Sequence, residues 1–346
     1  MKVLSMMSGG VDSSVATALL RDAGHDVVGV TLKLWGGASD SGCCSVSDVD
    51  DARRAADALG VAHHVFDFAD EFTRHVVEPY ASDHQEGRTP NPCIECNRHL
   101  KFAAVLERAE RLGFDAVATG HHARIVEHAD GSRRLARGAD AAKDQSYVLH
   151  VLGQAELART LLPLGHLTKA EVRAVAAELG LRTATKPDSQ DVCFITRSEG
   201  RQTFLGARIE LTPGRVVDRT GAEVGCVEGV ELVTIGQRRG LGLAGGGPPR
   251  YVVEVDRATS TVVVGDPADL LVAEQPVDGL RWSHLPVAGE VLVQCRAHGD
   301  ARPATIVEGG GGRAIVRWSG PQRRVAAGQS VVAYVGDEVV GGALAR

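Results

Sequence analysis

Short apolar stretches alternate with amphipathic stretches through the first 180 residues, and this alternation constrains the fold more than any other feature of the chain. Glycine follows each amphipathic stretch, as is typical at the end of a helix. The pattern predicts, in chain order, strand 2–7, helix 11–23, strand 27–34, helix 47–59, strand 62–66, helix 101–112, strand 116–119 and helix 168–179. Strands and helices in turn predict a parallel sheet covered on both faces, with ligands bound at the carboxyl ends of its strands.

The character of the chain changes after about residue 200. Residues 215–225 and 251–265 each read as two β-branched runs around turn residues, which is typical of hairpins. From about Val277, further short strands predict a small antiparallel β-barrel. We therefore predict an α/β domain over residues 1–198, a small β-rich linking domain over 199–275 and a C-terminal antiparallel β-barrel over 276–346.

Composition and charge exclude several classes of protein. The net charge of −6 argues against a non-specific nucleic-acid binder, although basic residues are locally dense. No apolar run approaches the roughly 20 residues of a membrane-spanning helix, and no secretory leader pattern opens the sequence. The seven cysteines are an odd number. We therefore expect a cytoplasmic protein without membrane association, whose cysteines serve thiol chemistry or metal binding rather than structural disulfides.

The segment SGGVDSS, residues 8–14, joins the first predicted strand to the first predicted helix. Glycines at such a turn let backbone N–H groups approach an anion, and the helix start adds positive partial charge. The segment lacks the lysine of GxxxxGK[ST] and is not GxGxxG. It resembles the loop of the ATP pyrophosphatases, which split ATP between the α- and β-phosphates. We expect the hydroxyls of Ser8, Ser13 and Ser14 to hold pyrophosphate, and Asp12 to bind magnesium or position a reacting group.

Cysteines in two further segments bear on which nucleophile follows adenylation. Cys93 and Cys96 form a CxxC pair in a proline-rich stretch that we read as a loop before a helix, with cationic side chains close by. Cys193 follows Asp188 and Asp191. Thiols near cations and helix starts ionise more readily, and the thiolate is the reactive form. Enzymes that adenylate carboxylates or amides do not need such cysteines, whereas sulfur carriers do.

Several long segments resemble the tRNA-specific 2-thiouridylase family, which installs sulfur at the 2-position of the wobble uridine of tRNA. They are SGGVDSS, GRTPNPCIECNRHLKF, ATGHHAR, KDQSYVL, KPDSQDVCF, TIGQRRGLGL and AAGQSVVAY, and they span nearly the whole chain. The resemblance implies that ATP and Mg²⁺ are required and that the substrate is tRNA with a wobble uridine. It also implies a sulfur donor such as a cysteine desulfurase or a sulfur-relay protein.

The resemblance implies roles for individual residues. Cys96 corresponds to the catalytic nucleophile, Cys193 to the cysteine that carries a persulfide, and Asp12 to a further catalytic position. The ATP-binding positions correspond to Met6, Met7, Ser8, Gly9, Gly10, Val11, Asp12, Ser13, Leu32 and Gly120. The positions that contact tRNA correspond to Asn91, Pro92, Cys93, His121, Lys143, Asp144, Gln145, Arg296, Ala297 and Gln329, of which the first three contact the target base.

These roles imply a sequence of steps. The 2-oxygen of the uridine attacks ATP, and the Cys193 persulfide then supplies sulfur. It does so either by direct attack on the base or after Cys96 has released sulfide. Both routes leave a transient Cys96–Cys193 disulfide, as is usual for catalytic disulfides in a reducing compartment. The residues do not choose between the routes.

The chain departs from the family pattern at three of these positions. Cys93 stands where the family usually has an aspartate that is a candidate proton carrier, so this chain has a CxxC pair that most relatives lack. Met6 replaces a glycine at the entrance of the loop, and Ala297 replaces an aromatic residue.

Two other readings of the sequence remain. Another ATP pyrophosphatase, a ligase or amidotransferase acting on a small molecule, would keep SGGVDSS and tolerate loss of Cys96 and Cys193. Alternatively, Cys43 and Cys44 with Cys93 and Cys96 would hold zinc or an iron–sulfur cluster in an RNA-binding protein whose ATP site is vestigial.

Overall fold

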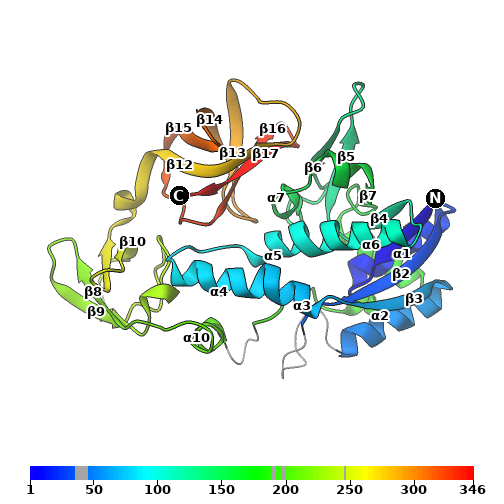
Figure 1. Cartoon of the computed structure of the whole chain (residues 1–346), viewed down its shortest axis with the longest axis horizontal. Coiled ribbons are helices and arrows are strands. Elements are labelled where there is room, and N and C mark those ends of the chain that lie inside the picture. Colours follow the sequence, from blue (N-terminus) through cyan, green and yellow to red (C-terminus); the bar gives the residue numbers. More distant parts are fainter. Residues whose placement is uncertain (36–45, 189–191, 196–199, 245–246) are drawn as a thin grey trace.

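A parallel sheet forms the centre of the first part of the chain in the computed structural model, which describes residues 1–35, 46–188, 192–195, 200–244 and 247–346 (Figure 1). Within these residues the sheet has the strand order β3-β2-β1-β4-β7, and every pairing in it is parallel. The strands are β1 (Lys2–Met6), β2 (Asp26–Lys33), β3 (Ala62–Asp67), β4 (Ala116–Ala118) and β7 (Thr160–Leu161).

The strand order reverses between β1 and β4. The chain adds β2 and β3 on one side of β1, then returns to place β4 on the other side. The connections after β1 and β4 therefore leave the sheet in opposite directions and open a crevice at the carboxyl ends of these two strands. Segment 8–14 follows β1 and segment 119–122 follows β4, so both segments lie at this crevice.

Helices cover both faces of the sheet, because neighbouring strand residues point to opposite sides. Val3 of β1 packs with α1 and α9 on one face, and Leu4 packs with η1, η2 and α6 on the other. The helical segments of this part are α1 (Val11–Asp22), α2 (Val46–Leu59), α3 (Ala69–Phe72), η1 (Thr73–Val77), α4 (Glu78–Gln85), α5 (Pro92–Glu95), η2 (Cys96–Ala104), α6 (Val105–Arg111), α7 (Ser146–Leu149), α8 (Gln154–Ala158), α9 (Lys169–Glu178), η3 (Arg182–Thr185) and α10 (Gly200–Gly206).

One expectation about these helices is wrong. The helix expected at 101–112 begins at Pro92, and α5, η2 and α6 run on without a break. Asn91 caps this helix by accepting a hydrogen bond from the N–H of Cys93 (3.1 Å). Proline at the first helical position after an asparagine cap is a start signal rather than a loop signal. Cys93 and Cys96 therefore lie on a helix and not in a loop.

The middle of the chain forms a separate four-stranded sheet with the order β10-β11-β8-β9. Both expected hairpins are present, and β11 pairs in parallel with β8 to join them. Its core is a cluster of valines and leucines that includes Val216, Val252 and Val262. The elements are β8 (Gly214–Asp218), β9 (Glu223–Val227), η4 (Val230–Leu232), β10 (Tyr251–Asp256), β11 (Thr261–Gly265) and η5 (Pro267–Leu270).

The C-terminal part is a closed antiparallel barrel. Its strands follow the order β12-β15-β14-β13-β16-β17, and the pairing of β12 with β17 closes it. These strands are β12 (Leu271–Trp282), β13 (Glu290–Gln294), β14 (Arg302–Gly310), β15 (Arg313–Arg323), β16 (Ser330–Val335) and β17 (Glu338–Ala345). The sequence patterns did not predict β12 and β17.

A hairpin from the first part of the chain extends the barrel sheet. Strands β5 (Ala123–Glu127) and β6 (Arg133–Arg137) pair with each other, and Ala136 of β6 pairs with Glu338 of β17. Next to this junction, the Arg137 guanidinium lies 3.9 Å from the ring centroid of Tyr334 and donates to the side chains of Asp144 and Gln294. The barrel is therefore fixed to the α/β part by backbone pairing and by a buried polar cluster.

The observed architecture confirms the predicted fold class of a parallel α/β domain, a small β-rich domain and a C-terminal antiparallel barrel. None of the helices in the described residues combines the length and apolar character that crossing a lipid bilayer requires.

Two histidines, the buried His84 and the half-buried His150, lie where the parts of the chain meet. His84 of α4 contacts the carbonyl oxygen of Glu231 in η4 through Nδ1 (3.2 Å), and burial lowers its pKa to about 4. His150 lies against Gly342 of β17, and burial lowers its pKa to about 3. Both rings are therefore neutral in the folded protein at pH 7.

Acid is expected to weaken these junctions. A histidine whose pKa falls on folding binds more protons in the unfolded state than in the folded state. Its contribution to the free energy of unfolding is therefore full above about pH 6.5 and is lost as the pH falls towards 4. We expect the free energy of unfolding to drop by about 3 kcal/mol per histidine between pH 6.5 and 4. Chemical denaturation across this range should show a smaller drop for His84→Asn, which keeps a donor for Glu231, than for the wild type. Substitution of the exposed His166 by Asn should leave the pH dependence of the free energy of unfolding unchanged. If His84→Asn and His166→Asn reduced that pH dependence equally, the role assigned to His84 would be contradicted.

Candidate active site

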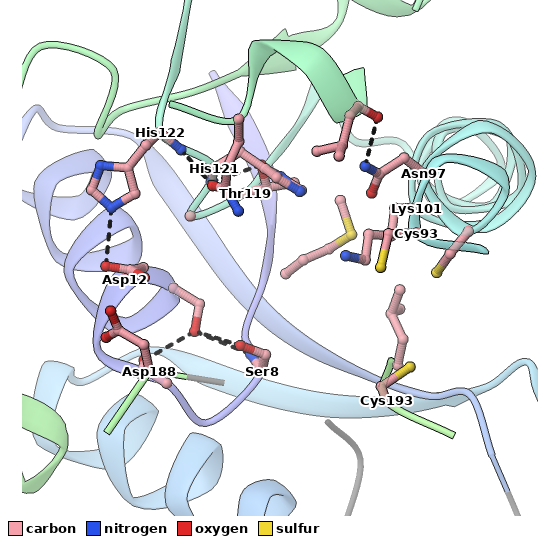
Figure 2. Close-up of a pocket in the computed structure, with 18 of the residues that line it drawn as sticks. Ser8, Asp12, Cys93, Asn97, Lys101, Thr119, His121, His122, Asp188 and Cys193 are labelled. Atoms are coloured by element: carbon pink, nitrogen blue, oxygen red, sulfur yellow. Dashed lines mark hydrogen bonds and ion pairs between the residues drawn. The ribbon is translucent and has the colours of Figure 1, made fainter. Parts of the chain in front are cut away.

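A cavity of about 1010 Å³ lies at the crevice between β1 and β4 and extends towards the barrel. The segments after both strands, helix α5–η2, the segment around Cys193, and Ala297 and His298 of the barrel all line it. Figure 2 shows the result: Ser8, Asp12 and Asp188 lie at one end, and Cys93, Asn97, Lys101 and Cys193 at the other. The cavity thus has a polar end with ionised groups and an end with thiols.

Glycine is required twice to shape the polar end. Gly9 has φ +72°, and a Cβ on it would lie 2.2 Å from the carbonyl oxygen of Asp48. A Cβ on Gly120 would lie 2.7 Å from the backbone nitrogen of Ser13, so the segment after β4 packs directly against the start of α1. These close approaches keep both segments at the cavity wall with their backbones accessible to an anion.

The three serines of the segment differ in their orientation. Ser8 and Ser13 line the cavity, and the Ser13 hydroxyl accepts a hydrogen bond from the N–H of Ser8 (3.1 Å). Ser14 is fully buried and its hydroxyl donates to the carbonyl oxygen of Gly10 (2.9 Å). The expectation that the Ser14 hydroxyl holds pyrophosphate is therefore wrong: this hydroxyl stabilises the first turn of α1.

Lys169 joins two carboxylates at the polar end of the cavity. Its Nζ lies 2.7 Å from both oxygens of Asp12 and 2.8 Å from Oδ1 of Asp188. His122 Nε2 adds a 3.2 Å contact to Asp12, and Lys143 (2.7 Å) and Arg173 (2.8 Å) donate to Asp188. The segments that carry Asp12 and Cys193 are thereby held in one charge network, which we call the lysine bridge (Lys169 with Asp12 and Asp188).

The charges of this network fix its protonation states. Burial would raise the pKa of Asp12, but hydrogen bonds from His122 and Lys169 outweigh it and the pKa lies below its ordinary value. At Asp188 burial acts in the same sense, and hydrogen bonds from Lys143 and Lys169 lower the pKa to about 2. Both carboxylates are therefore ionised at pH 7, beside cationic groups that can also face phosphate.

Lys186 also lines the cavity and reinforces the glycine turn. Its Nζ donates to the carbonyl oxygen of Gly9 (3.0 Å) and to the carboxylates of Asp48 (2.8 Å) and Asp51 (2.7 Å). These carboxylates and burial act in opposite senses on Lys186, and the net effect raises its pKa. Lys186 therefore stays cationic beside the segment where an anion would bind.

An aromatic cluster holds the segment that bears Cys193. Phe194 is 2 % exposed, and its ring centroid lies 5.1 Å from that of Phe204 and 5.5 Å from those of Phe72 and Tyr80. Edge-to-face packing of this kind stabilises a large apolar side chain in one place. Cys193 is therefore fixed at the cavity wall by its neighbour.

The thiol end of the cavity is lined by both buried polar and apolar groups. Asn97 is 1 % exposed, and its side-chain amide donates to the carbonyl oxygen of Val148 (3.0 Å). His121 Nδ1 contacts Thr119 Oγ1 (2.7 Å), and burial places the pKa of His121 well below its ordinary value. With Pro92, Tyr147 and Val148 these residues form a wall suited to a neutral, planar heterocycle.

A second cavity, of about 860 Å³, lies between the middle domain and the barrel. Five arginines line it: Arg201, Arg296, Arg302, Arg323 and Arg324. Gln329 lines it too, and its side-chain amide donates to the carbonyl oxygen of Thr89, just before the segment with Asn91. The arginine cavity is therefore connected through one residue to the helix start at the first cavity.

Most residues implied by the family resemblance lie together. The first cavity is lined by Met6, Met7, Ser8, Gly10, Val11, Asp12, Ser13, Leu32, Pro92, Cys93, Cys96, Gly120, His121, Lys143, Asp144, Gln145, Cys193 and Ala297. Gly9 and Asn91 shape its wall from behind, and Arg296 and Gln329 line the arginine cavity. The carboxylate of Asp144 is bound by Arg137 and Ser146, so it holds the barrel junction.

Sequence reasoning did not single out Lys169, Lys186, Asn97 or His122 as site residues. Lys186 and Asn97 belong to the cysteine-containing segments KPDSQDVCF and CNRHLKF. Their place in these segments could have indicated that they belong to the site. Lys169 carried a weaker signal, because it is the first residue of a helix whose Thr168–Glu171 capping box is present as expected. Lys169 is separated from Asp12 by 157 positions in the sequence, so no local pattern predicts their ion pair.

The described residues do not form a metal site of their own. No group of three or more His, Cys, Asp or Glu side chains among them is arranged to hold a metal ion. Asp12 and Asp188 are both paired with Lys169 in this structure. Cys43 and Cys44, which one reading of the sequence assigned to a metal, lie outside the described residues.

Comparison with known proteins identifies the class and then the family. Residues 1–197 match the family described as tRNA methyl transferase HUP domain, residues 202–266 its PRC-barrel domain, and residues 277–345 an aminomethyltransferase beta-barrel domain. With the glycine turn after β1, the first match defines an ATP pyrophosphatase of the HUP type.

Curated relatives specify the family. The chain is 48 % identical over 351 residues to the tRNA-specific 2-thiouridylase MnmA of Chloroflexus aurantiacus, covering 98 % of this chain and 97 % of that protein. It is 49 % identical over 363 residues to the protein of the same name from Beutenbergia cavernae (99 % and 93 % covered) and over 359 residues to that from Mycobacteroides abscessus (99 % of each). The chain belongs to the MnmA family of tRNA-specific 2-thiouridylases.

The lysine bridge generates a prediction for the nucleotide reaction. Lys169→Gln removes the cation between Asp12 and Asp188, and we expect kcat/KM for ATP to fall roughly 100-fold, the loss typical of a buried charge-stabilising donor. Pyrophosphate release measures this, with thermal unfolding to monitor the fold. Lys33→Gln is the matched control, because Lys33 forms only an exposed ion pair with Asp67. An equal effect of both substitutions would contradict a role for the bridge.

Proposed function

We propose that this protein converts the wobble uridine of tRNA to 2-thiouridine in an ATP-dependent reaction, with ATP at the polar end of the first cavity and the base at the thiol end. The observation that carries the proposal is the single cavity shared by the glycine turn after β1, Cys96 and Cys193. An ATP-dependent ligase without sulfur chemistry has no use for thiols in that place.

ATP binding is assigned to the groups around the crevice. The adenine lies against apolar side chains at the ends of β1 and β2, among them Met6 and Leu32. Backbone N–H groups of the glycine turn and the hydroxyls of Ser8 and Ser13 face the β- and γ-phosphates. Lys169 and Lys143, which pair with Asp12 and Asp188 in this structure, supply positive charge to the phosphates.

Magnesium would then reach the site with the phosphates of ATP. Mg²⁺ commonly binds through one or two carboxylates and the substrate's phosphate oxygens, and Asp12 is the carboxylate at the glycine turn. Lys169 occupies both of its oxygens here, so no step of the reaction is assigned to the metal.

Adenylation activates the base. The 2-oxygen of the uridine attacks the α-phosphorus, pyrophosphate leaves, and the proton on N3 is lost, so that C2 carries AMP as a leaving group. Wobble uridines lie in an unpaired loop, where a base can be turned out of its stack into a pocket at low cost. Asn97, His121 and Tyr147 line the wall that such a base would contact.

Sulfur transfer follows at the same carbon. The terminal sulfur of a Cys193 persulfide attacks C2 and AMP departs. The Cys96 thiolate then attacks Cys193 Sγ, which releases the thiocarbonyl and leaves a Cys96–Cys193 disulfide. If Cys96 acts first, it releases sulfide from the persulfide and the sulfide attacks C2, with the same products. Phe194 and helix α5–η2 hold the two cysteines at the wall of one cavity, which supports either order.

The sulfur donor and the compartment follow from this chemistry. The persulfide must be supplied by a donor of the cysteine desulfurase or sulfur-relay type, since nothing in the described residues generates it. A reaction on tRNA that ends in a disulfide needs a reducing compartment, so we assign the protein to the cytoplasm.

Nucleoside analysis of tRNA tests the two thiols. Incubation with ATP and a sulfur source should give 2-thiouridine with wild-type protein and none with Cys96→Ser or Cys193→Ser, while both variants still release pyrophosphate. Asp12→Ala should lose pyrophosphate release and keep tRNA binding. Cys226→Ser is the matched control, because this exposed thiol lies on β9 of the middle domain. Wild-type amounts of 2-thiouridine from either active-site variant would refute the assignment.

The arginine cavity generates a prediction for tRNA binding. Contacts between arginines and phosphates make binding weaken as salt rises, with a slope of the logarithmic plot that counts the contacts. We expect Arg323→Gln with Arg324→Gln to reduce that slope by about 2. Arg53→Gln on the far helix α2 should leave the slope unchanged. Equal slopes for the double variant and the wild type would place the tRNA elsewhere.

A further inference from the structure

Three cysteines line the first cavity, and they differ in exposure. Cys96 is buried, with 5 % of its surface exposed. Cys193 is half-buried, and Cys93 is exposed. The proposed reaction uses only Cys96 and Cys193. Cys93 is the thiol that stands where the family usually has an aspartate, and its chemistry is not that of a carboxylate.

The helix that begins at Pro92 sets the spacing of Cys93 and Cys96. The two residues are three apart on α5 and its continuation, so they share one face of the helix. Their Cα atoms are therefore about 5 Å apart by helix geometry, within the range of about 4.4 to 6.8 Å that a disulfide spans. The capping bond from Asn91 to the N–H of Cys93 fixes the first of them.

The end of each turnover presents a problem of access. A disulfide is reduced by a thiolate that reaches one of its sulfurs directly. Cys96 is 5 % exposed and Cys193 is half-buried, whereas Cys93 is exposed. A reductant in solution therefore meets Cys93 more readily than the disulfide behind it.

We propose that Cys93 is the resolving thiol of the catalytic cycle, an inference that rests on the proposed function. The Cys93 thiolate attacks Cys96 Sγ of the Cys96–Cys193 disulfide, so that the Cys93–Cys96 bond forms and the Cys96–Cys193 bond breaks. Cys193 leaves as a thiolate and takes up the proton that Cys93 lost, ready to receive the next persulfide. A dithiol reductant then reduces the exposed Cys93–Cys96 disulfide and is itself oxidised to its disulfide.

Charge near Cys93 favours this step. Lys101 lies on the same helix and lines the same cavity, and Figure 2 shows it at the thiol end with Cys93. A cationic neighbour stabilises the thiolate, which is the attacking form. The transfer carries the disulfide from a buried position to an exposed one over a single helical turn.

Peptide mapping after one turnover tests the proposal directly. The protein is loaded with persulfide by inorganic polysulfide, desalted, allowed to react with ATP and tRNA without reductant, then alkylated and digested with trypsin without reduction. Residues 89–98 form one peptide with Cys93 and Cys96. Residues 183–197 form another with Cys193, because the bond between Lys186 and Pro187 resists trypsin.

The linkage distinguishes the outcomes. We expect wild-type protein to yield peptide 89–98 with an internal disulfide and peptide 183–197 alkylated at Cys193, whereas Cys93→Ser should yield the two peptides cross-linked. Wild-type protein that yields only the cross-linked pair would overturn the inference and leave the proposed function intact. Absence of 2-thiouridine in every sample, with no disulfide formed, would instead refute the proposed function.

Turnover kinetics supply an independent readout. For each variant, the rate of the later turnovers is divided by the rate of the first turnover. Any effect of Cys93 on tRNA contact changes both rates and cancels in this ratio. Each turnover needs one reduction by dithiothreitol, and an exposed Cys93–Cys96 disulfide is reached more easily than a disulfide that includes only Cys96 and Cys193. With dithiothreitol near 0.1 mM we therefore expect this ratio to be severalfold lower in Cys93→Ser than in the wild type. Cys93→Asp should behave in the same way, and excess dithiothreitol should restore both. Ratios equal to the wild type at low reductant would overturn the proposal.

Discussion

Lys169 holds together parts of the chain that the reaction needs in one place. Its ammonium group bridges Asp12, at the start of the helix after β1, and Asp188, on the segment that leads to Cys193. This ammonium group offsets the repulsion between the two carboxylates across the crevice. The bridge therefore couples the nucleotide end of the cavity to its thiol end. Its ammonium group also provides positive charge for a departing pyrophosphate.

The sheet and the barrel contribute different halves of the site. The reversal of strand order between β1 and β4 opens the crevice, and Gly9 and Gly120 let the two following segments approach it closely. The barrel closes the cavity from above with Ala297 and His298, and it is held there by the β6–β17 pairing and the cluster around Arg137. Docking of the barrel therefore places Ala297 and His298 in the wall of the cavity that holds the thiols.

Local patterns predicted much of the fold, and distant contacts could not be predicted from them. The alternation of apolar and amphipathic stretches predicted β1 to β4 of the parallel sheet but not the two-residue strand β7, and the Thr168–Glu171 capping box correctly marked the start of α9. Pro92 was read as a loop signal although it begins a helix, which hid the helical spacing of Cys93 and Cys96. The lysine bridge joins residues far apart in sequence, and no local pattern shows which carboxylate a lysine meets. The inward direction of the Ser14 hydroxyl likewise depends on where α1 packs.

The account depends on one claim, that the base itself is activated by ATP in the cavity where the two thiols lie. Isotope labelling measures this most directly: tRNA with oxygen-18 at the 2-position of the wobble uridine is converted in a single turnover, and the AMP is analysed by mass spectrometry. Attack of that oxygen on the α-phosphorus predicts one labelled oxygen in AMP for each 2-thiouridine formed. Unlabelled AMP, with the label released into water, would contradict the account.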